Sequence, residues 1–379
     1  LKENFSNKNF GAVSVWVNQY LLHTKNKKTI VYCRKLPLYQ NYLSDNKVPI
    51  NVNNQFYTNL NYIKKINTHL IKNTVYCVEI HNRPEYARFL ILNNKDIKIN
   101  FIFHNDPNSI RYSKTIKEKL FLLENCHKII FVSNWVKERF FFNLDVNHKN
   151  NTHVIYNFIK PLKKFPIKKK IIIFSGKLNK SKGYKIFGES IIPILNKYPG
   201  WKAIVCGSEE REKYSFFHKR LKIMNWTEHK KLLSLYSKCS IAVVNPTWQE
   251  PFGRTALESS SRGCAVITSK SGGLIETFKN NLILKNNNKN NLIKLISKLI
   301  KNKKYLLKIQ KNNFNNVIHT PLKSIIKLDL DKDPIKISIN NDIKSYKIIH
   351  IASFGEKTNH RLFNLSISLN YSLLLNRMK

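Results

Sequence analysis

Acidic side chains, paired cysteines and long apolar runs are all scarce in this sequence of 379 residues. Only 23 Asp and Glu residues stand against 66 Lys and Arg, which gives a formal charge of +43. No apolar run approaches the roughly 18 to 20 residues needed to cross a bilayer, which argues against a membrane-spanning helix. The opening stretch, LKENFSNKNF, lacks both an initiator methionine and the apolar core of a secretory signal.

No C-x-x-C pair occurs, so the usual zinc-site and redox spacings are absent. Several of the cysteines lie in apolar, strand-like runs, where cysteine behaves as a small hydrophobic residue. We therefore expect reduced, structural thiols and a cytosolic setting, at most at the inner face of a membrane. The six are Cys33, Cys77, Cys126, Cys206, Cys239 and Cys264.

The positive charge admits three interpretations. Lysines are spread along the whole chain among many Asn and Ile residues, which favours a solvated surface produced by compositional drift. Attraction to an anionic membrane or a phosphorylated acceptor is the second interpretation. Nucleic-acid binding is the third, but no zinc-finger, RNP or KH signature supports it, so we expect no specific nucleic-acid partner.

Short β-rich runs alternate with longer helical patterns, which is typical of parallel α/β sheets. The length exceeds one comfortable core, so we expect two such sheets facing each other across a cleft. The Pro- and Lys-rich stretch KPLKKFPIKKK marks the linker between them. The strands we expect are TIVYC, TVYCVEI, KINFIFH, HKIIFVS and THVIYN in the first half, and KIIIFSG, WKAIVCG, IAVVNP and CAVITS in the second.

These patterns divide the chain into four parts. We expect the first domain to lack its first strand, because the sequence opens just before the helical run GAVSVWV. The tail reads as a strand, a loop and an amphipathic helix, and two hypotheses fit it. It either begins a second, truncated unit, which we favour, or docks KIIHIAS into the vacant edge or centre of the first sheet. The parts are residues 1–160, 161–325, the linker 326–345 and the tail 346–379.

Two carboxylates stand out in the stretch NPTWQEPFGRTALE. Seven residues separate Glu250 from Glu258, and GRTALESSSRG has the pattern of a helix starting near Gly253. Two carboxylates brought together by the turn can each accept hydrogen bonds from a vicinal diol. Alternatively, Glu250 caps the helix and Glu258 is simply solvated.

Upstream, FSGKLNKSKG places Lys177 and Lys182 in a strand-to-helix loop, where Gly176 and Gly183 allow close backbone approach. Two ammonium groups there match a diphosphate without a metal ion. In so basic a chain, a solvated basic loop is the alternative.

Taken together and in order, FSGKLNKSKG, NPTWQEPFGRTALE and SRGCAVITSKSGGLIE resemble the donor-binding half of the retaining glycosyltransferases of family 4. That resemblance implies the GT-B fold, with two Rossmann-like domains, and covers residues 160–280. Glu250 and Glu258 match the family's E-x7-E motif, and Gly272 to Glu276 match its Gly-Gly-x-x-Glu element. The loop departs from the family in having Lys177 where an arginine is usual, so its phosphate contact cannot be bidentate.

The resemblance also implies roles for single residues on the donor side. Lys177 and Lys182 would neutralise the departing diphosphate, Glu250 would accept hydrogen bonds from sugar hydroxyls, and Glu258 would hold the ribose. Further donor contacts are implied for Gly11, Gly176, Trp226, Phe252, Gly253, Arg254 and Thr255. A plain core aromatic is the alternative for Trp226.

In the first domain, His104 follows the strand-like run FIF, where the family places a histidine facing the donor sugar. Asp106 is a weaker candidate beside it. His81, Arg83 and Glu85, at another strand end, are assigned to acceptor binding, with local turn chemistry as the alternative.

The resemblance implies a metal-independent, retaining hexosyltransferase that uses a nucleotide sugar as co-substrate and needs no other cofactor. No Asp-x-Asp element lies at a matching place, and the implied acceptor is a glycan or a lipid-linked glycan of surface polysaccharide or lipopolysaccharide synthesis. Two other functions stay open: a non-catalytic basic binding module with a degenerate GT-B fold, and a GT-B synthase that uses a sugar phosphate.

Overall fold

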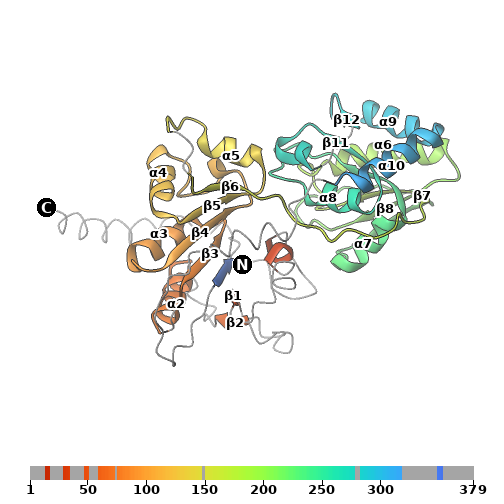
Figure 1. The fold of residues 1–379 in the computed structure, drawn as a ribbon. Coiled ribbons are helices and arrows are strands. Elements are labelled where there is room, and N and C mark those ends of the chain that lie inside the picture. Colours follow the sequence, from red (N-terminus) through yellow and green to blue (C-terminus); the bar gives the residue numbers. More distant parts are fainter. Residues whose placement is uncertain are drawn as a thin grey trace.

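The structure is a computed structural model that describes residues 13–17, 29–34, 47–50, 59–72, 75–146, 150–277, 282–317 and 348–352. Two parallel sheets, each flanked by helices, form two lobes joined by the segment that follows residue 154 (Figure 1). We call them the first and the second domain. The expected architecture of two parallel α/β domains is confirmed.

The sheet of the first domain has seven strands, and every neighbouring pair is parallel. Its strands at residues 77–81, 98–103 and 128–131 are buried along nearly their whole length, as expected for a sheet covered on both faces. In spatial order the strands of the sheet are β2 (Lys47–Ile50), β1 (Thr29–Arg34), β13 (Ile348–Ala352), β3 (Cys77–His81), β4 (Lys98–Phe103), β5 (Lys128–Phe131) and β6 (Thr152–Val154).

The helices of this domain are α2 (Asn59–Ile71), α3 (Pro84–Asn93), α4 (Ile116–Asn125) and α5 (Asn134–Phe141), with the short 3-10 helix η3 (Pro107–Ser109). Helix α4 starts with a capping box. Thr115 Oγ1 accepts from the backbone N–H of Glu118, whose carboxylate accepts from the backbone N–H of Thr115 at 2.9 Å. Residues 13–17 are also helical and buried.

The sheet of the second domain has six parallel strands, in the order β12 (Ile283–Leu284), β11 (Ala265–Ser269), β10 (Cys239–Val244), β7 (Lys169–Ser175), β8 (Lys202–Cys206) and β9 (Leu221–Met224). The chain builds outward from β7 in both directions, so the strand order reverses between β7 and β10. Its helices are α6 (Tyr184–Lys197), α7 (His229–Lys238), α8 (Arg254–Ser261), α9 (Lys289–Lys301) and α10 (Lys303–Asn315), with the 3-10 helix η4 (Gly272–Glu276).

The strand of the C-terminal tail lies in the middle of the first sheet. Residues 348–352 form β13, which pairs in parallel with β1 on one side and β3 on the other (Figure 1). This is the docking arrangement of the second hypothesis, and the start of a separate second unit, which we favoured, does not account for it. The predicted linker 326–345 and the predicted tail helix lie outside the described residues.

The nine strands expected in the two halves and the strand expected in the tail are present, whereas β2, β9 and β12 were not predicted. β9 has no fully buried position, and β12 has two residues, so neither produces an apolar run. Helices α9 and α10 are separated at Asn302, because its side chain accepts from the backbone N–H of Tyr305 and starts a new helix. Five of the six cysteines are free and buried, as expected; the side chain of Cys33 is not described.

Candidate active site

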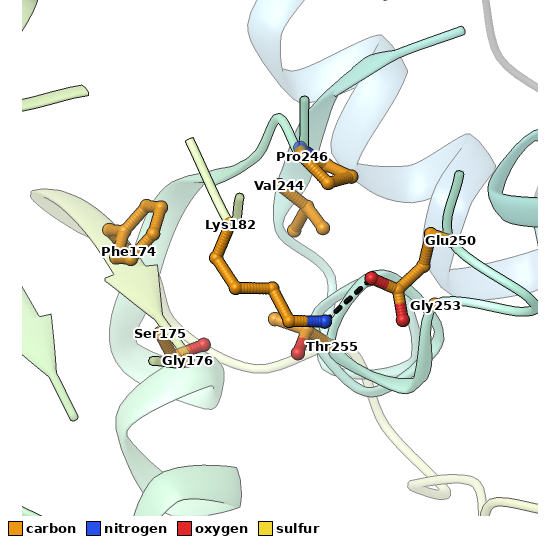
Figure 2. Close-up of a pocket in the computed structure, with 9 residues that line it drawn as sticks. All are labelled: Phe174, Ser175, Gly176, Lys182, Val244, Pro246, Glu250, Gly253 and Thr255. Carbon is orange, nitrogen blue, oxygen red and sulfur yellow. Dashed lines mark hydrogen bonds and ion pairs between the residues drawn. The ribbon is translucent and has the colours of Figure 1, made fainter. Parts of the chain in front are cut away.

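A pocket opens at the carboxyl ends of β7 and β10, where the strand order of the second sheet reverses. Open α/β sheets bind their ligands at such a point, because the loops from the two strands diverge there. Lys182 and Glu250 extend towards each other in the pocket (Figure 2). It is lined by Phe174, Ser175, Gly176, Lys182, Val244, Pro246, Glu250, Gly253 and Thr255.

The loop after β7 reaches the pocket through a backbone that only glycine allows. Gly183 has a φ of 82°, and a Cβ there would lie 2.0 Å from the carbonyl oxygen of Asn245. Asn179 Oδ1 accepts from the backbone N–H of Lys182 at 3.0 Å and so holds the loop that carries this lysine. The predicted Lys177 follows the pocket-lining Gly176, but its side chain is exposed and does not itself line the pocket.

Lys182 and Glu250 form an ion pair in the pocket. Lys182 Nζ lies 2.7 Å from Glu250 Oε2, and both side chains are partly buried. Trp248 joins them: its Nε1–H donates to the same oxygen at 2.9 Å, and Lys182 Nζ lies 4.7 Å from the centroid of its ring. Trp248 was not predicted as a site residue, since nothing in the sequence shows which way it points.

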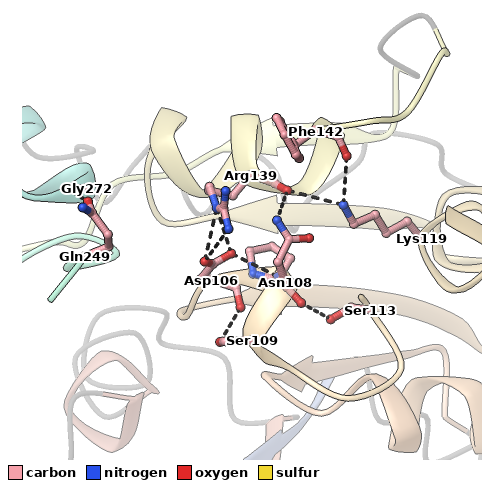
Figure 3. Close-up of polar contacts among 10 residues, drawn as sticks. Asp106, Asn108, Ser109, Ser113, Lys119, Arg139, Phe142, Gln249 and Gly272 are labelled. Carbon is pink, nitrogen blue, oxygen red and sulfur yellow. Dashed lines mark hydrogen bonds and ion pairs between the residues drawn. The ribbon is translucent and has the colours of Figure 1, made fainter. Parts of the chain in front are cut away.

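The turn that carries Glu250 is held from both domains. Ser133 Oγ, in the first domain, donates to the Pro251 carbonyl at 2.6 Å, and the backbone N–H of Gly273 donates to the Glu250 carbonyl at 2.9 Å. The Gln249 side chain accepts from the backbone N–H of Gly272 at 2.7 Å, and Figure 3 shows these two residues. The side chain of Phe252 is buried in the hydrophobic cluster of the first domain.

Glu258 lies one and a half turns into α8 and is buried. Its Oε1 accepts from Arg254 Nη2 at 2.9 Å and lies 3.0 Å from His229 Nε2. Burial acts to raise the pKa of Glu258, but Arg254 and His229 outweigh it and hold that pKa below its usual value. Glu258 is therefore ionised and paired beside the pocket without lining it. His229 is a second unpredicted residue, brought in by the start of α7.

His104 and His81, from neighbouring strand ends, form a pair. His104 Nε2 lies 3.0 Å from His81 Nδ1, and Asn82 Oδ1 accepts from the backbone N–H of His104 at 2.7 Å. Burial, with a smaller contribution from Arg254 in the second domain, lowers the pKa of His104 to about 3. His104 is thus neutral and within electrostatic range of the start of α8. His81 is fully buried, and its contact orients His104.

The other predicted residues are placed more locally. Arg83 pairs with Glu85 at 3.4 Å, and burial raises the pKa of Glu85. Asp106 caps η3 and pairs with Arg139 at 3.2 Å (Figure 3). Trp226 is 45% exposed and does not line the pocket. Gly11 lies outside the described residues.

Among the described residues, no three His, Cys, Asp or Glu side chains lie close enough together to hold a metal ion. Within the same part of the chain, no helix has the length and apolar character to cross a membrane.

The second domain matches a known family. Residues 157–316 correspond to the group 1 glycosyl transferases. The putative glycosyltransferase YtcC of Bacillus subtilis (strain 168) is 24% identical over 270 residues, which are 62% of this chain and 66% of that protein. Spore coat protein SA of the same strain is 28% identical over 132 residues, 31% of this chain and 35% of that protein. The chain therefore spans less than two thirds of either relative.

Solved structures show the same fold. The crystal structure of Anabaena Alr3699/HepE in complex with UDP and glucose superposes with a TM-score of 0.59 at 14% identity, covering 79% of this chain and 97% of that one. That overlap includes both domains, as the GT-B architecture requires. The chain accordingly has the GT-B fold, and its residues 157–316 are similar to the group 1 glycosyl transferases.

Proposed function

We propose that this protein is a glycosyltransferase that moves a sugar from a nucleotide-sugar donor to a glycan or lipid-linked acceptor. The observation that carries the proposal is the position of the Lys182–Glu250 pair. It lies at the strand-order reversal of the second sheet and faces the start of α8. The pocket thus offers a cation, helix-start amides and a carboxylate, which are complementary to a diphosphate and to sugar hydroxyls.

The donor diphosphate would bind between Lys182 and the start of α8. Gly253 precedes that helix with a φ of 95°, so its backbone approaches the pocket without a side chain in the way. Helix-start N–H groups carry a partial positive charge that favours phosphate oxygens. Lys182 would then stabilise the charge that develops as the diphosphate leaves, the role a metal ion serves in other transferases. We therefore propose that the transfer needs no metal ion.

Glu250 would accept hydrogen bonds from the donor sugar, while Glu258, ionised and held by Arg254 and His229, would bind the ribose beside the pocket. The first domain would bring His104 towards the sugar, because the turn after Glu250 already contacts that domain through Ser133 and Phe252. A neutral His104 can donate a hydrogen bond without adding a second positive charge near Arg254. We further propose that the transfer retains the anomeric configuration, that the donor carries a hexose and that the protein works in the cytosol.

A thermal-shift screen of the purified protein tests this proposal. UDP, GDP and ADP, each free and as its glucose derivative, would be compared, because a ligand that binds only the folded protein raises the melting temperature. We expect one nucleoside diphosphate and its sugar to shift the melting temperature, and the corresponding sugar nucleotide to be turned over with or without EDTA.

The non-catalytic basic module predicts a different result. All six nucleotides and a plain polyanion such as heparin would then stabilise the protein in proportion to their charge, and no nucleotide sugar would be consumed. Glu258→Gln separates the two cases further. It should weaken binding of the selected nucleotide and leave heparin binding unchanged, since one carboxylate among so many basic groups hardly alters the overall field.

A further inference from the structure

We propose that Trp248 is a positioning residue for donor recognition. Its indole N–H would hold Glu250 in the orientation that accepts a sugar hydroxyl when the ligand draws Lys182 away. This inference rests on the proposed function and adds to it a residue that lies two positions before Glu250 and was not among the predicted site residues. The two oxygens of the Glu250 carboxylate have different numbers of hydrogen-bond donors around them.

Both protein donors meet the same oxygen of the Glu250 carboxylate. Lys182 Nζ lies 2.7 Å and Trp248 Nε1 lies 2.9 Å from Oε2. Among the described residues, Oε1 has no such protein partner, and Glu250 lines the pocket. A carboxylate fixed through one oxygen presents the other to the pocket as a free acceptor.

Lys182 cannot pair equally well with the Glu250 carboxylate and with a bound diphosphate at the same time. Its ammonium group is a compact charge on a flexible stem, and in the structure Glu250 is its ion-pair partner. A diphosphate brings more charge into the same pocket, so Lys182 will move towards it and weaken its bond to Glu250. Trp248 is then the donor that still fixes the carboxylate, because an indole N–H is neutral and has no attraction for the phosphate charge comparable to that of Lys182.

The ring of Trp248 contributes as well. It is 41% exposed at the edge of the pocket, and Lys182 Nζ lies over its face at 4.7 Å. The ring therefore limits where the lysine can go when it leaves Glu250. Trp248 thus touches both members of the ion pair, and each through a different chemical group: the N–H for the carboxylate and the π-face for the ammonium.

Replacing Trp248 by Phe removes the N–H and keeps a ring for Lys182. Titration calorimetry of UDP and of UDP-glucose would measure the affinity that the sugar adds, as the ratio of the two dissociation constants. We expect Trp248→Phe to leave the UDP affinity within about twofold and to lower the sugar's contribution by about five- to tenfold, the size of one typical net hydrogen bond. Trp248→His, which restores a ring N–H, should recover part of that loss.

A double-mutant cycle with Glu250→Gln shows whether the effect passes through the carboxylate. In the Glu250→Gln background, Trp248→Phe should change the UDP-glucose to UDP ratio by less than about twofold. The inference is overturned if Trp248→Phe has the same ratio of UDP to UDP-glucose dissociation constants as the wild type. It is also overturned if Trp248→Phe changes this ratio equally with Glu250 and with Gln at position 250. The GDP and ADP pairs are titrated in the same way, and a wild type that binds none of the three nucleoside diphosphates or their glucose derivatives overturns the proposed function, and this inference with it. Melting temperatures of the variants establish that each is folded.

Discussion

The carboxylate of Glu276, in the second domain, lies 2.8 Å from the backbone nitrogen of Trp135, in the first domain. The same carboxylate accepts from the backbone N–H of Asn134 at 2.8 Å and from the Tyr156 hydroxyl at 3.0 Å. It therefore caps the start of α5 from across the domain boundary, where an anion is favoured by the helix dipole. One residue of the Gly-Gly-x-x-Glu element thus joins the two domains next to the turn that carries Glu250.

Glu276→Ala should loosen this contact. Losing an N-terminal helix cap and the hydroxyl's acceptor should lower the free energy of unfolding by about 1–2 kcal/mol. Hydrogen exchange at the amides of Asn134 and Trp135 should become faster. Denaturant titration and mass-resolved hydrogen exchange measure the two effects. Glu189→Ala, on an exposed i,i+4 pair at 3.9 Å from Lys185, is the control and should change stability by less than about 0.5 kcal/mol. Equal effects in both variants would contradict the interdomain cap.

The buried ammonium group of Lys119, on α4, caps the C-terminal end of α5. Lys119 is 2% exposed, and its Nζ donates to the carbonyls of Arg139 at 3.4 Å and Phe142 at 3.2 Å (Figure 3). Lys119→Met keeps the volume and leaves the Phe142 carbonyl without this donor, which should cost about 1–3 kcal/mol. Lys117→Met, at an exposed position of α4, the helix that carries Lys119, is the matched control. If both variants unfold at the same denaturant concentration, the buried lysine is not a C-terminal cap.

The neutral state of His104 gives stability a pH dependence of known sign. Its pKa is lowered to about 3 in the folded protein, so between the usual histidine value and pH 3 the unfolded chain binds a proton that the folded chain does not. The free energy of unfolding therefore falls as the pH falls through that window. His104→Gln cannot titrate but can still hydrogen-bond to His81, so its stability should fall less between pH 7 and pH 4.5. Parallel curves for wild type and variant would show that His104 is protonated in the folded state.

The sequence was sufficient for the fold wherever a strand forms an apolar run. β4 and β11 were predicted from such runs, and nearly every residue in them is buried. The position of β13 could not be deduced. A strand of suitable pattern can pair with any open neighbour, and its partners β1 and β3 lie far away along the chain.

The site residues could be predicted where a motif fixes the backbone. They could not be predicted where a contact depends on the rotamer of a side chain. Lys182, Glu250, Gly253 and Thr255 line one pocket because glycines set the loop and the helix start around them. Trp248 and His229 were missed, because their contacts with Glu250 and Glu258 depend on rotamers. Glu258, expected to face the pocket, lies beside it, since Arg254 one turn earlier on α8 competes for its carboxylate.

The Glu258 contact with His229 makes a separate prediction for the donor site. His229→Ala removes one of the two side chains that hold the Glu258 carboxylate but leaves Arg254 in place. We expect nucleotide affinity to fall by about three- to tenfold, because the carboxylate becomes less well oriented for the ribose. Calorimetry with the selected nucleoside diphosphate measures it, and an unchanged affinity would mean that Arg254 alone positions Glu258.

The account depends most on Lys182 as the cation that meets the diphosphate. Calorimetry of the selected nucleoside diphosphate with wild type, Lys182→Ala and Lys185→Ala tests it directly, since Lys185 is an exposed lysine three residues further along the chain. The account predicts at least a tenfold loss of affinity for Lys182→Ala and less than a twofold change for Lys185→Ala, at about 1.4 kcal/mol per tenfold. Equal, small losses in both variants would mean that the nucleotide binds the general positive field of the surface, and would contradict it.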